Sequence, residues 1–194
     1  MKLNYQKIRE AIEAKGYSFF TGEINLNFVG IRTMGGKLNH WDDMFALCYQ
    51  EGTVEKTWLS QSFTTDPGTY YLQQKLLTPK GCAILAPGQY RRMWTFGKHR
   101  GKYDAFIQNA PCKVFRDRDM DNELDYIPDS VQIGNFGINL HHGHDAVNVG
   151  PHSAGCQVFR YAQHLKYTLD IARRSALRYG NNFTYTLLTS DDFR

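Results

Sequence analysis

The strongest constraint on the fold is an alternation of apolar and polar residues that repeats through the middle of the chain. The segment "INLNFVGIR" (24–32) alternates Ile24, Leu26 and Phe28 with asparagines, as a half-buried β-strand does. Similar segments follow, separated by Gly, Pro, Asn and Asp turn signals; they are 43–52, 56–65, 81–90, 103–108, 112–117 and 136–141. The middle of the chain is therefore predicted to be β-rich.

Segments with the spacing of helices precede and follow these strands. Ile8, Ala11 and Ile12 predict one face of a short helix over about residues 4–15, which Gly16 is placed to end. From Gln157 onward, apolar residues recur at steps of four and three and predict a long helix closed by Gly180. They are Val158, Ala162, Leu165, Leu169, Ala172 and Ala176. A last strand is predicted over residues 183–189, which makes the fold class α+β.

Length and composition favour one domain. The 194 residues, 42% of them hydrophobic, can bury one substantial core, so we expect a single domain over 1–194 with an N-terminal helical extension over 1–20. The net charge of +4 does not demand a nucleic-acid partner. Basic residues are concentrated in "RRMWTFGKHRGK" (91–102). We interpret this stretch as the solvent-exposed face of a strand pair; the alternative is that it binds phosphates or an anionic polymer.

No apolar run has the length of a signal peptide or a membrane span. The sequence therefore predicts synthesis in the cytoplasm and no membrane partner. Association with a virion, or release by lysis or another route, would then bring the protein to a cell wall. The oligomeric state stays open.

The four cysteines lie far apart, without a C-x-x-C pair, so a structural zinc site or a redox dithiol is not expected. Cys48, Cys82 and Cys112 lie in apolar strand-like runs, where a cysteine usually behaves as a small buried hydrophobe. Only Cys156 lies among Gly, Ser and His. It is therefore the candidate for chemistry.

The segment "INLHHGHDAVNVGPHSAGCQVF" (138–159) holds that cysteine and four histidines. Strand alternation points His141 away from Leu140 and the core, so His141 is favoured over His142 as a general base. We expect Cys156 at the N-terminus of the long helix, where unpaired N–H groups and the helix dipole favour a thiolate. The N–H groups of Gly155 and Cys156 are then candidates to stabilise an oxyanion.

Three alternatives stay open at this stage. Cys156 could serve only helix capping and packing. The histidines of the segment could bind zinc, although their spacing matches no known helix motif for it; they are His141, His142, His144 and His152. A cysteine peptidase of another fold would draw its base from a distant histidine; the candidates are His40, His99 and His164.

This segment resembles the active-site signature of the YkuD-type L,D-transpeptidases. In that family a strand ending in an apolar residue, His and Gly or Ser is followed by S-H-G-C and an apolar run. Here "LHHG" matches the first part and "SAGCQV" the second, with Ser153, Gly155 and Cys156 in place. Ala154 replaces the second histidine, as in a divergent S-x-G-C branch. "TTDPGTYYL" and "LAPGQY" loosely match the upstream T-P-x-G-x-Y element.

The resemblance implies a β-rich L,D-transpeptidase-like sheet or sandwich core and acyl transfer on peptidoglycan stem peptides. Cys156 would form a thioester that an amine or water captures, and no cofactor is required. Ser153 and Asn139 would orient the histidine and the substrate, while Arg160 or Tyr90 could hold a stem-peptide carboxylate. A bacteriophage protein would fit the missing export signal. Because of Ala154, the alternative is a catalytically inactive cell-wall-binding or virion structural module of the same fold.

A second candidate site lies in the acidic stretch "DRDMDNELD" (117–125). Its aspartates match positions 1, 3, 5 and 9 of an EF-hand-like calcium loop; they are Asp117, Asp119, Asp121 and Asp125. The twelfth position is Pro128, which cannot ligate through its side chain. A structural Ca²⁺ that pins this loop and a solvated acidic turn are both compatible with the pattern.

Overall fold

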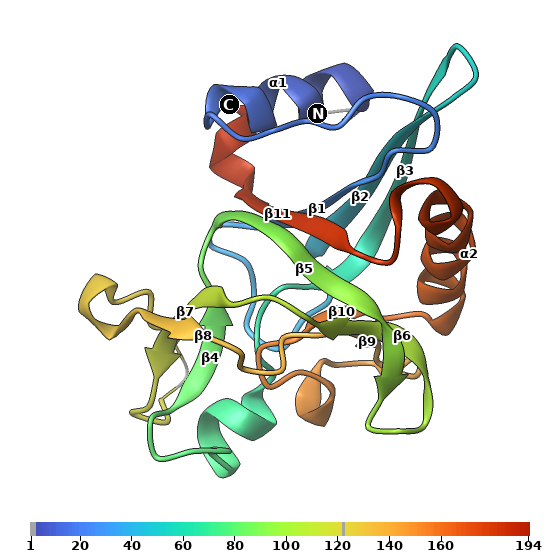
Figure 1. The fold of residues 1–194 in the computed structure, drawn as a ribbon. Helices are drawn as coiled ribbons and strands as arrows, with labels where there is room; N and C mark the ends of the chain where they lie inside the picture. Colours follow the sequence, from blue (N-terminus) through green and yellow to red (C-terminus); the bar gives the residue numbers. More distant parts are fainter. Residues whose placement is uncertain (1–2, 122) are drawn as a thin grey trace.

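The alternating segments pair edge to edge, and eight strands close into a barrel in the computed structural model, which describes residues 3–121 and 123–194. The barrel order is β1-β11-β5-β6-β9-β10-β3-β2, and a separate sheet has the order β4-β7-β8 (Figure 1). The strands are β1 (Asn27–Arg32), β2 (Asp43–Glu51), β3 (Val54–Thr64), β4 (Cys82–Leu85), β5 (Gly88–His99), β6 (Tyr103–Gln108), β7 (Cys112–Asp117), β8 (Gln132–Gly134), β9 (Leu140–His142), β10 (Gln157–Phe159) and β11 (Phe183–Thr189). The helices are α1 (Tyr5–Ala14) and α2 (Ala162–Tyr179), with short helical turns at Tyr70–Gln74, Pro128–Ser130, Gly150–His152 and Ser190–Phe193. The α+β class is confirmed, and the core of the fold is a closed barrel.

Aromatic side chains fill the barrel, which explains the predicted alternation. Phe28, Phe45 and Phe106 are fully buried and meet one another and Trp94 at tilted or edge-to-face angles, the arrangement that aromatic quadrupoles favour. Helix α2 adds Leu165 and other apolar residues to this core. The interior is thus packed with side chains.

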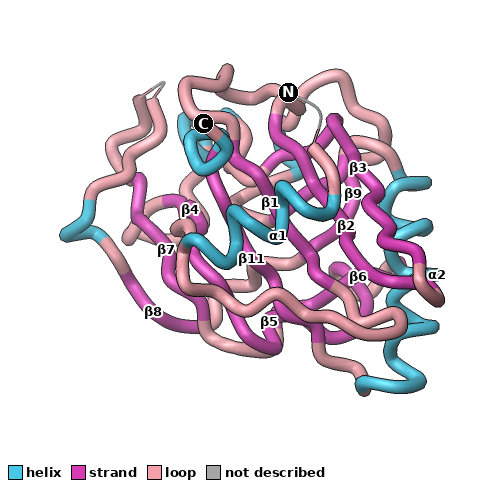
Figure 2. Tube along the Cα trace, turned by 90° about the horizontal axis from the view of Figure 1, so that it is seen from above, coloured by secondary structure: helices cyan, strands magenta, loops and turns pink. Residues whose placement is uncertain are grey.

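The N-terminal helix lies across the outside of the barrel, over β1 and β11 (Figure 2). Ile8 and Ile12 are fully buried against outward-facing residues of those strands. The side chain of Asn4 accepts a hydrogen bond from the Lys7 N–H at 3.0 Å and caps the helix start. Lys15, just past the helix, forms an ion pair with Asp192 at 2.6 Å, so the two ends of the chain meet. The predicted helix over 4–15 is confirmed.

Two boundaries differ from the prediction. The segment 81–90 divides between β4 and β5, because the chain passes from the small sheet to the barrel there. Residues 157–159 form β10, and α2 begins only at Ala162, so the prediction of a helix from Gln157 is wrong. Val158 fits both a helical and a strand period, and its pairing with β9 and β3 decides the outcome.

None of the helices in residues 3–121 and 123–194 combines the length and the apolar composition that crossing a membrane requires.

One buried polar network anchors β10. The Tyr185 hydroxyl, on β11, donates to Oε1 of Gln157 at 2.6 Å inside the barrel. Nε2 of Gln157 donates to the carbonyl oxygens of Thr65 and Gly155 at 3.3 and 3.4 Å. Because Gln157 follows Cys156 directly, this network fixes the backbone that carries the cysteine.

We predict that Tyr185→Phe destabilises the protein by about 1–3 kcal/mol, since it leaves the buried Gln157 oxygen without a donor. Urea unfolding followed by circular dichroism measures this loss. The matched control is Tyr179→Phe, whose hydroxyl donates to the carbonyl of Glu23 at the surface and should cost less than about 0.5 kcal/mol. Equal stability of the two variants would show that the network does not anchor β10.

Candidate active site

Strand pairing places the predicted cysteine and histidine on one face of the barrel, without a hydrogen bond between the two side chains. Strands β9 and β10 are parallel neighbours, with Val158 opposite His141 and Gln157 opposite Leu140. Side chains of paired residues lie on the same face of a sheet, and residues two apart share that face. Cys156 therefore lies on the face of His141, one step away on the adjacent strand. Leu140 points into the barrel core, so this shared face is the outside of the barrel.

His141 is held in one tautomer. Its Nδ1 lies 3.0 Å from the carbonyl oxygen of His142, which can only accept, so Nδ1 carries the proton. Its Nε2 is buried and has no hydrogen-bond partner within the described part of the chain. Burial, followed by the neighbouring His99, holds the pKa of His141 well below its ordinary value of 6.5. The ring is thus a neutral imidazole with an unoccupied acceptor nitrogen.

Cys156 is half-buried and is a thiol at neutral pH. Its Sγ lies 3.3 Å from the carbonyl oxygen of Gly137, to which the S–H donates. Burial raises the pKa of Cys156 to about 11, although a hydrogen bond from the Asn139 N–H and the charge of Arg100 both lower it. The sulfur can therefore act as a nucleophile only if a base removes its proton during the reaction.

The expected position of Cys156 at the N-terminus of the long helix is wrong. Cys156 precedes β10, and α2 begins at Ala162. Because the helix dipole acts within about the first turn, it does not lower the pKa of this thiol. The raised pKa of about 11 does not support the predicted resting thiolate, and a base would have to remove the proton before the sulfur could react.

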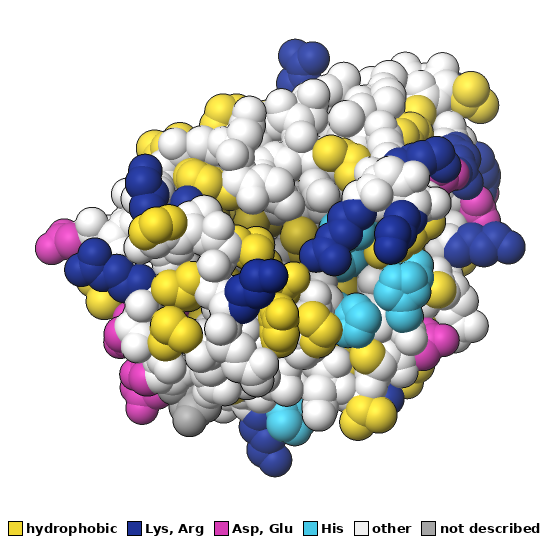
Figure 3. Space-filling view, turned by 90° about the horizontal axis from the view of Figure 1, so that it is seen from below, with side chains coloured by type: hydrophobic (Ala, Val, Ile, Leu, Met, Phe, Trp, Pro, Cys, Tyr) yellow, Lys and Arg dark blue, Asp and Glu magenta, His cyan; other side chains and the backbone are white. Residues whose placement is uncertain are grey.

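The β5–β6 hairpin supplies residues that the sequence did not single out for this site. His99 stacks on His141, with ring centroids 3.9 Å apart at 21°. The Tyr103 hydroxyl lies 3.2 Å from the carbonyl of His142 and 3.3 Å from Nδ1 of His141. These contacts fix the plane of the imidazole. The basic stretch 91–102 belongs to the β5–β6 strand pair, as predicted, and Arg100 and Lys102 at its end line a small pocket together with histidines. Lys and Arg side chains lie beside histidines on this face of the molecule (Figure 3).

The other predicted catalytic residues have mainly supporting positions. His142 accepts the His144 N–H at its Nδ1, at 3.2 Å, and so belongs to the turn after β9. Ser153 is fully buried, and its Oγ donates to the carbonyl of Cys156 at 2.9 Å. The N–H of Gly155 donates to Ser153 Oγ at 3.2 Å, which occupies one of the two predicted oxyanion donors. The N–H of Cys156 remains as the other candidate.

Gly155 cannot be another residue here. Its φ is +116°, and a Cβ would lie 1.9 Å from the backbone oxygen of Ala83, on β4. Only glycine tolerates both conditions. The bend that it allows turns the chain from the 150–154 segment into Cys156 and β10.

The residues predicted to bind substrate lie in different places. The Asn139 side chain accepts from the Gln108 N–H at 2.9 Å and contacts Nδ1 of His99 at 3.4 Å, so it orients His99 and not His141. The Tyr90 hydroxyl is buried and donates to the carbonyl of Ala86, which leaves it unable to hold a carboxylate. The Arg160 guanidinium lies over the ring of Tyr161, with Cζ 5.2 Å from the centroid.

The histidines do not form a metal site. Among the described residues, the side chains whose ligand atoms converge within 4.8 Å of one another are Asp117, Asp119 and Asp125. The zinc alternative for the 141–152 segment is thus not supported. His40 Nδ1 lies 2.9 Å from the carbonyl oxygen of Leu38, and His164 Nδ1 lies 2.9 Å from Ser60 Oγ. Both histidines therefore have hydrogen-bond partners other than Cys156.

Three of the four aspartates of the predicted calcium loop do meet. Asp117 is buried, and burial raises the pKa of its carboxyl to about 6. Asp125 donates its backbone N–H to Asp117 at 3.2 Å. Asp121 lies outside the group and accepts the Glu123 N–H at 2.6 Å. Calcium binding at this loop stays a prediction.

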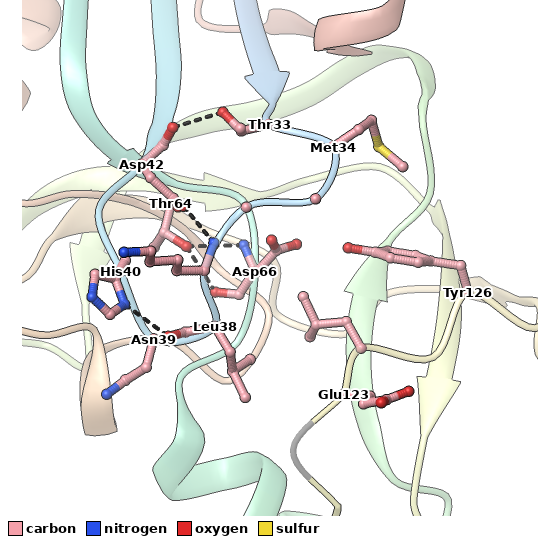
Figure 4. Close-up of a pocket in the computed structure, with 14 residues that line it drawn as sticks. Thr33, Met34, Leu38, Asn39, His40, Asp42, Thr64, Asp66, Glu123 and Tyr126 are labelled. Atoms are coloured by element: carbon pink, nitrogen blue, oxygen red, sulfur yellow. Dashed lines mark hydrogen bonds between the residues drawn. The ribbon is translucent and has the colours of Figure 1, made fainter.

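A separate cavity of about 320 Å³ lies between the β1–β2 loop and residues 123–126 (Figure 4). Two hydrogen bonds join polar groups of its lining: Asp42 accepts the Lys37 N–H at 2.7 Å, and Thr33 Oγ1 donates to the Asp42 carbonyl at 2.7 Å. Asp66, on its wall, is paired with the buried Arg32 at 2.8 Å. The residues lining it include neither Cys156 nor His141, so we assign it no role in the chemistry.

Comparisons of the chain with protein-family models, with curated proteins and with solved structures find no match. Function is therefore inferred from the geometry of the site and from the resemblance of its motif.

We predict that iodoacetamide alkylates Cys156 before the other three cysteines. Cys48, Cys82 and Cys112 are buried, as the sequence predicted, and burial raises the pKa of each to about 12. The rate at Cys156 should rise with pH into the alkaline range, because the thiolate fraction grows toward a pKa of about 11. Peptide mass spectrometry over a pH series measures it. A rate that levels off near pH 6 would instead show a resting thiolate.

Proposed function

We propose that the protein is a cysteine-dependent acyltransferase or peptidase of L,D-transpeptidase type that acts on peptidoglycan stem peptides. The observation that carries the proposal is the pair formed by Cys156 and His141. The two side chains share one face of adjacent strands, and His141 offers a neutral ring with an unpartnered Nε2. A thiol on the same face as such a base, once the two come into contact, is the minimal equipment for covalent acyl transfer.

In the first half of the reaction, Nε2 of His141 takes the thiol proton as Sγ of Cys156 attacks the carbonyl carbon of an L-residue. The Cys156 N–H is the candidate donor to the oxyanion. The peptide bond to the following D-residue then breaks, and its amine leaves with the proton from the His141 imidazolium. A thioester on Cys156 is the product.

In the second half, an amine or water attacks the thioester carbonyl, and His141 again accepts the proton of the attacking group. The C–S bond breaks, and the proton returns to Cys156, which restores the thiol. An amine acceptor gives transpeptidation, whereas water gives carboxypeptidase or endopeptidase activity. Neither half requires a metal or a cofactor.

The alternative is a catalytically inactive cell-wall-binding or virion structural module. One observation favours it, namely that burial raises the pKa of Cys156 to about 11 and leaves the sulfur donating to the carbonyl of Gly137. Such a thiol is inert unless His141 acts on it. The two functions therefore differ in whether removal of either side chain changes a reaction.

We predict that purified protein converts muropeptides and that Cys156→Ala lowers turnover by at least about 1000-fold. His141→Gln should lower it by about 100-fold to 10,000-fold, since it removes the general base. The control His40→Gln changes a histidine outside the site and should leave turnover unchanged. Mass spectrometry of the products, with and without an added amine, separates transfer from hydrolysis. Equal turnover by wild type and Cys156→Ala would overturn the mechanism and favour the inactive module.

We further predict that kcat/KM stays level from about pH 8 down through pH 6. Burial disfavours the charged imidazolium, which lowers the pKa of His141, so the neutral base persists at a pH where an ordinary histidine is half protonated. Stopped assays in buffers of constant ionic strength measure the profile. A midpoint near 6.5 would contradict a buried base, and a tenfold rise per pH unit above pH 8 would indicate attack by free thiolate.

A further inference from the structure

A cavity of about 350 Å³ lies between the end of α2, the start of β11 and the segment before β1. Its volume falls within the roughly 300–1,000 Å³ of small-molecule sites, and its described lining shares no residue with the candidate active site. Arg91 and Arg92, from β5, belong to this lining, and none of the described residues around the cavity is Asp or Glu. The cavity therefore carries positive charge.

A bulge in β5 brings both arginines to this cavity. Where β5 pairs with β11, the three residues 91–93 stand opposite the single residue Thr184. Arg92 has a left-handed backbone there, with φ of 56°, and its N–H donates to Thr184 Oγ1 at 3.3 Å. In a regular strand, two consecutive side chains point to opposite faces of the sheet. The bulge redirects them, so Arg91 and Arg92 line one cavity.

The two guanidinium groups have no charged partner. The ion pairs and side-chain hydrogen bonds within residues 3–121 and 123–194 do not involve either of them. The Arg91 guanidinium lies over the ring of Phe20, with Cζ 4.9 Å from the centroid. Such a contact uses the face of the guanidinium and leaves its N–H edge able to donate. Two cations are thus available to an anion.

The remaining walls offer a hydroxyl and aromatic surface. Ser175, on α2, lines the cavity and is only 3% exposed, yet its hydroxyl forms no hydrogen bond with the residues that the structure describes. On the same helix, the Thr168 hydroxyl donates to the carbonyl of His164 at 2.9 Å. Phe20 and Tyr179 supply aromatic rings to the lining. A ligand with an anionic group and an apolar body would satisfy all of these groups.

Charge matching indicates which anion fits. A phosphate monoester carries about −1.5 to −2 charge at pH 7 and three acceptor oxygens, which matches two guanidinium groups and one hydroxyl. A carboxylate carries a single charge and would leave one arginine uncompensated.

We infer that this cavity binds a small organic phosphate. Its phosphoryl group lies on Arg91, Arg92 and Ser175, and an aromatic or apolar body lies against Phe20 and Tyr179. The inference does not depend on the proposed function, because the site is separate from the cysteine and the histidines.

Calorimetry with the wild-type protein at low ionic strength tests the site. Phenyl phosphate is the probe, and inorganic phosphate and benzoate are the comparisons. Phenyl phosphate should bind at least about tenfold more tightly than either of them, because it alone combines a charge near −2 with a ring.

Substitutions then locate the binding. Arg91→Gln and Arg92→Asn should each lower the affinity for phenyl phosphate about tenfold or more, and Asn tolerates the left-handed backbone at position 92. Ser175→Ala should lower it about threefold, which non-specific attraction to a basic surface would not do. The matched control is Arg118→Gln, which removes the same charge from an exposed position after β7 and should leave the affinity unchanged. Circular dichroism checks that each variant is folded.

Three results would overturn the inference. The first is absence of binding by the wild-type protein at about 10 mM phenyl phosphate. The second is equal affinity for phenyl phosphate and either comparison compound, which needs no variant to establish. The third is a loss with Arg118→Gln as large as that with Arg92→Asn, because it would show attraction to net charge and not to this cavity.

Discussion

The parallel pairing of β9 with β10 is the constraint on which the candidate site depends. Two strands of three residues each close the barrel between β6 and β3, and their register sets His141 and Cys156 on one face. A slip of one residue would turn one of the two side chains into the core. The Gln157 side chain forms buried hydrogen bonds with Tyr185, Thr65 and Gly155. These bonds oppose such a slip, because a shifted Gln157 would lose all of these partners.

The pair is neutral in its resting state. Burial acts on both members in the direction of the uncharged form, raising the pKa of the Cys156 thiol and lowering that of the His141 imidazole. An ion pair would have to overcome both effects. In the proposed reaction, charge would therefore develop only as Cys156 attacks, and the charge of Arg100 acts on the thiol in the direction that favours the thiolate.

Local patterns predicted most of the fold. The helix at 4–15 and the strand at 183–189 were predicted because their residues repeat at one period throughout and end at turn signals. The strand β10 was missed, because three residues are too few to show a period and Val158 continues the spacing of α2. Because β10 was not predicted, the position of Cys156 just before this strand was not predicted either. The barrel closure was also beyond prediction, since it depends on pairings between segments far apart in the chain.

The same reason explains which site residues were found. Cys156 and His141 were predicted because they lie in one short segment of unusual composition. His99, Arg100 and Tyr103 lie 35 to 39 residues before that segment and reach it only through the β5–β6 hairpin. Arg100 and Gly101 have positive φ in the tight three-residue connection between His99 and Tyr103, and nothing in the local sequence indicated which element this connection would face.

The buried nitrogen of His141 favours the proposed active site over an inactive module of the same fold. A buried polar atom without a partner costs about 1–3 kcal/mol, and Nε2 of His141 is such an atom. A binding module gains nothing from this cost, because an apolar side chain at position 141 would pack on the outer face without it. The cost is explained if the nitrogen has a partner during function, such as the Cys156 proton. Buried polar atoms without a hydrogen-bond partner are expected at sites where a protein performs chemistry.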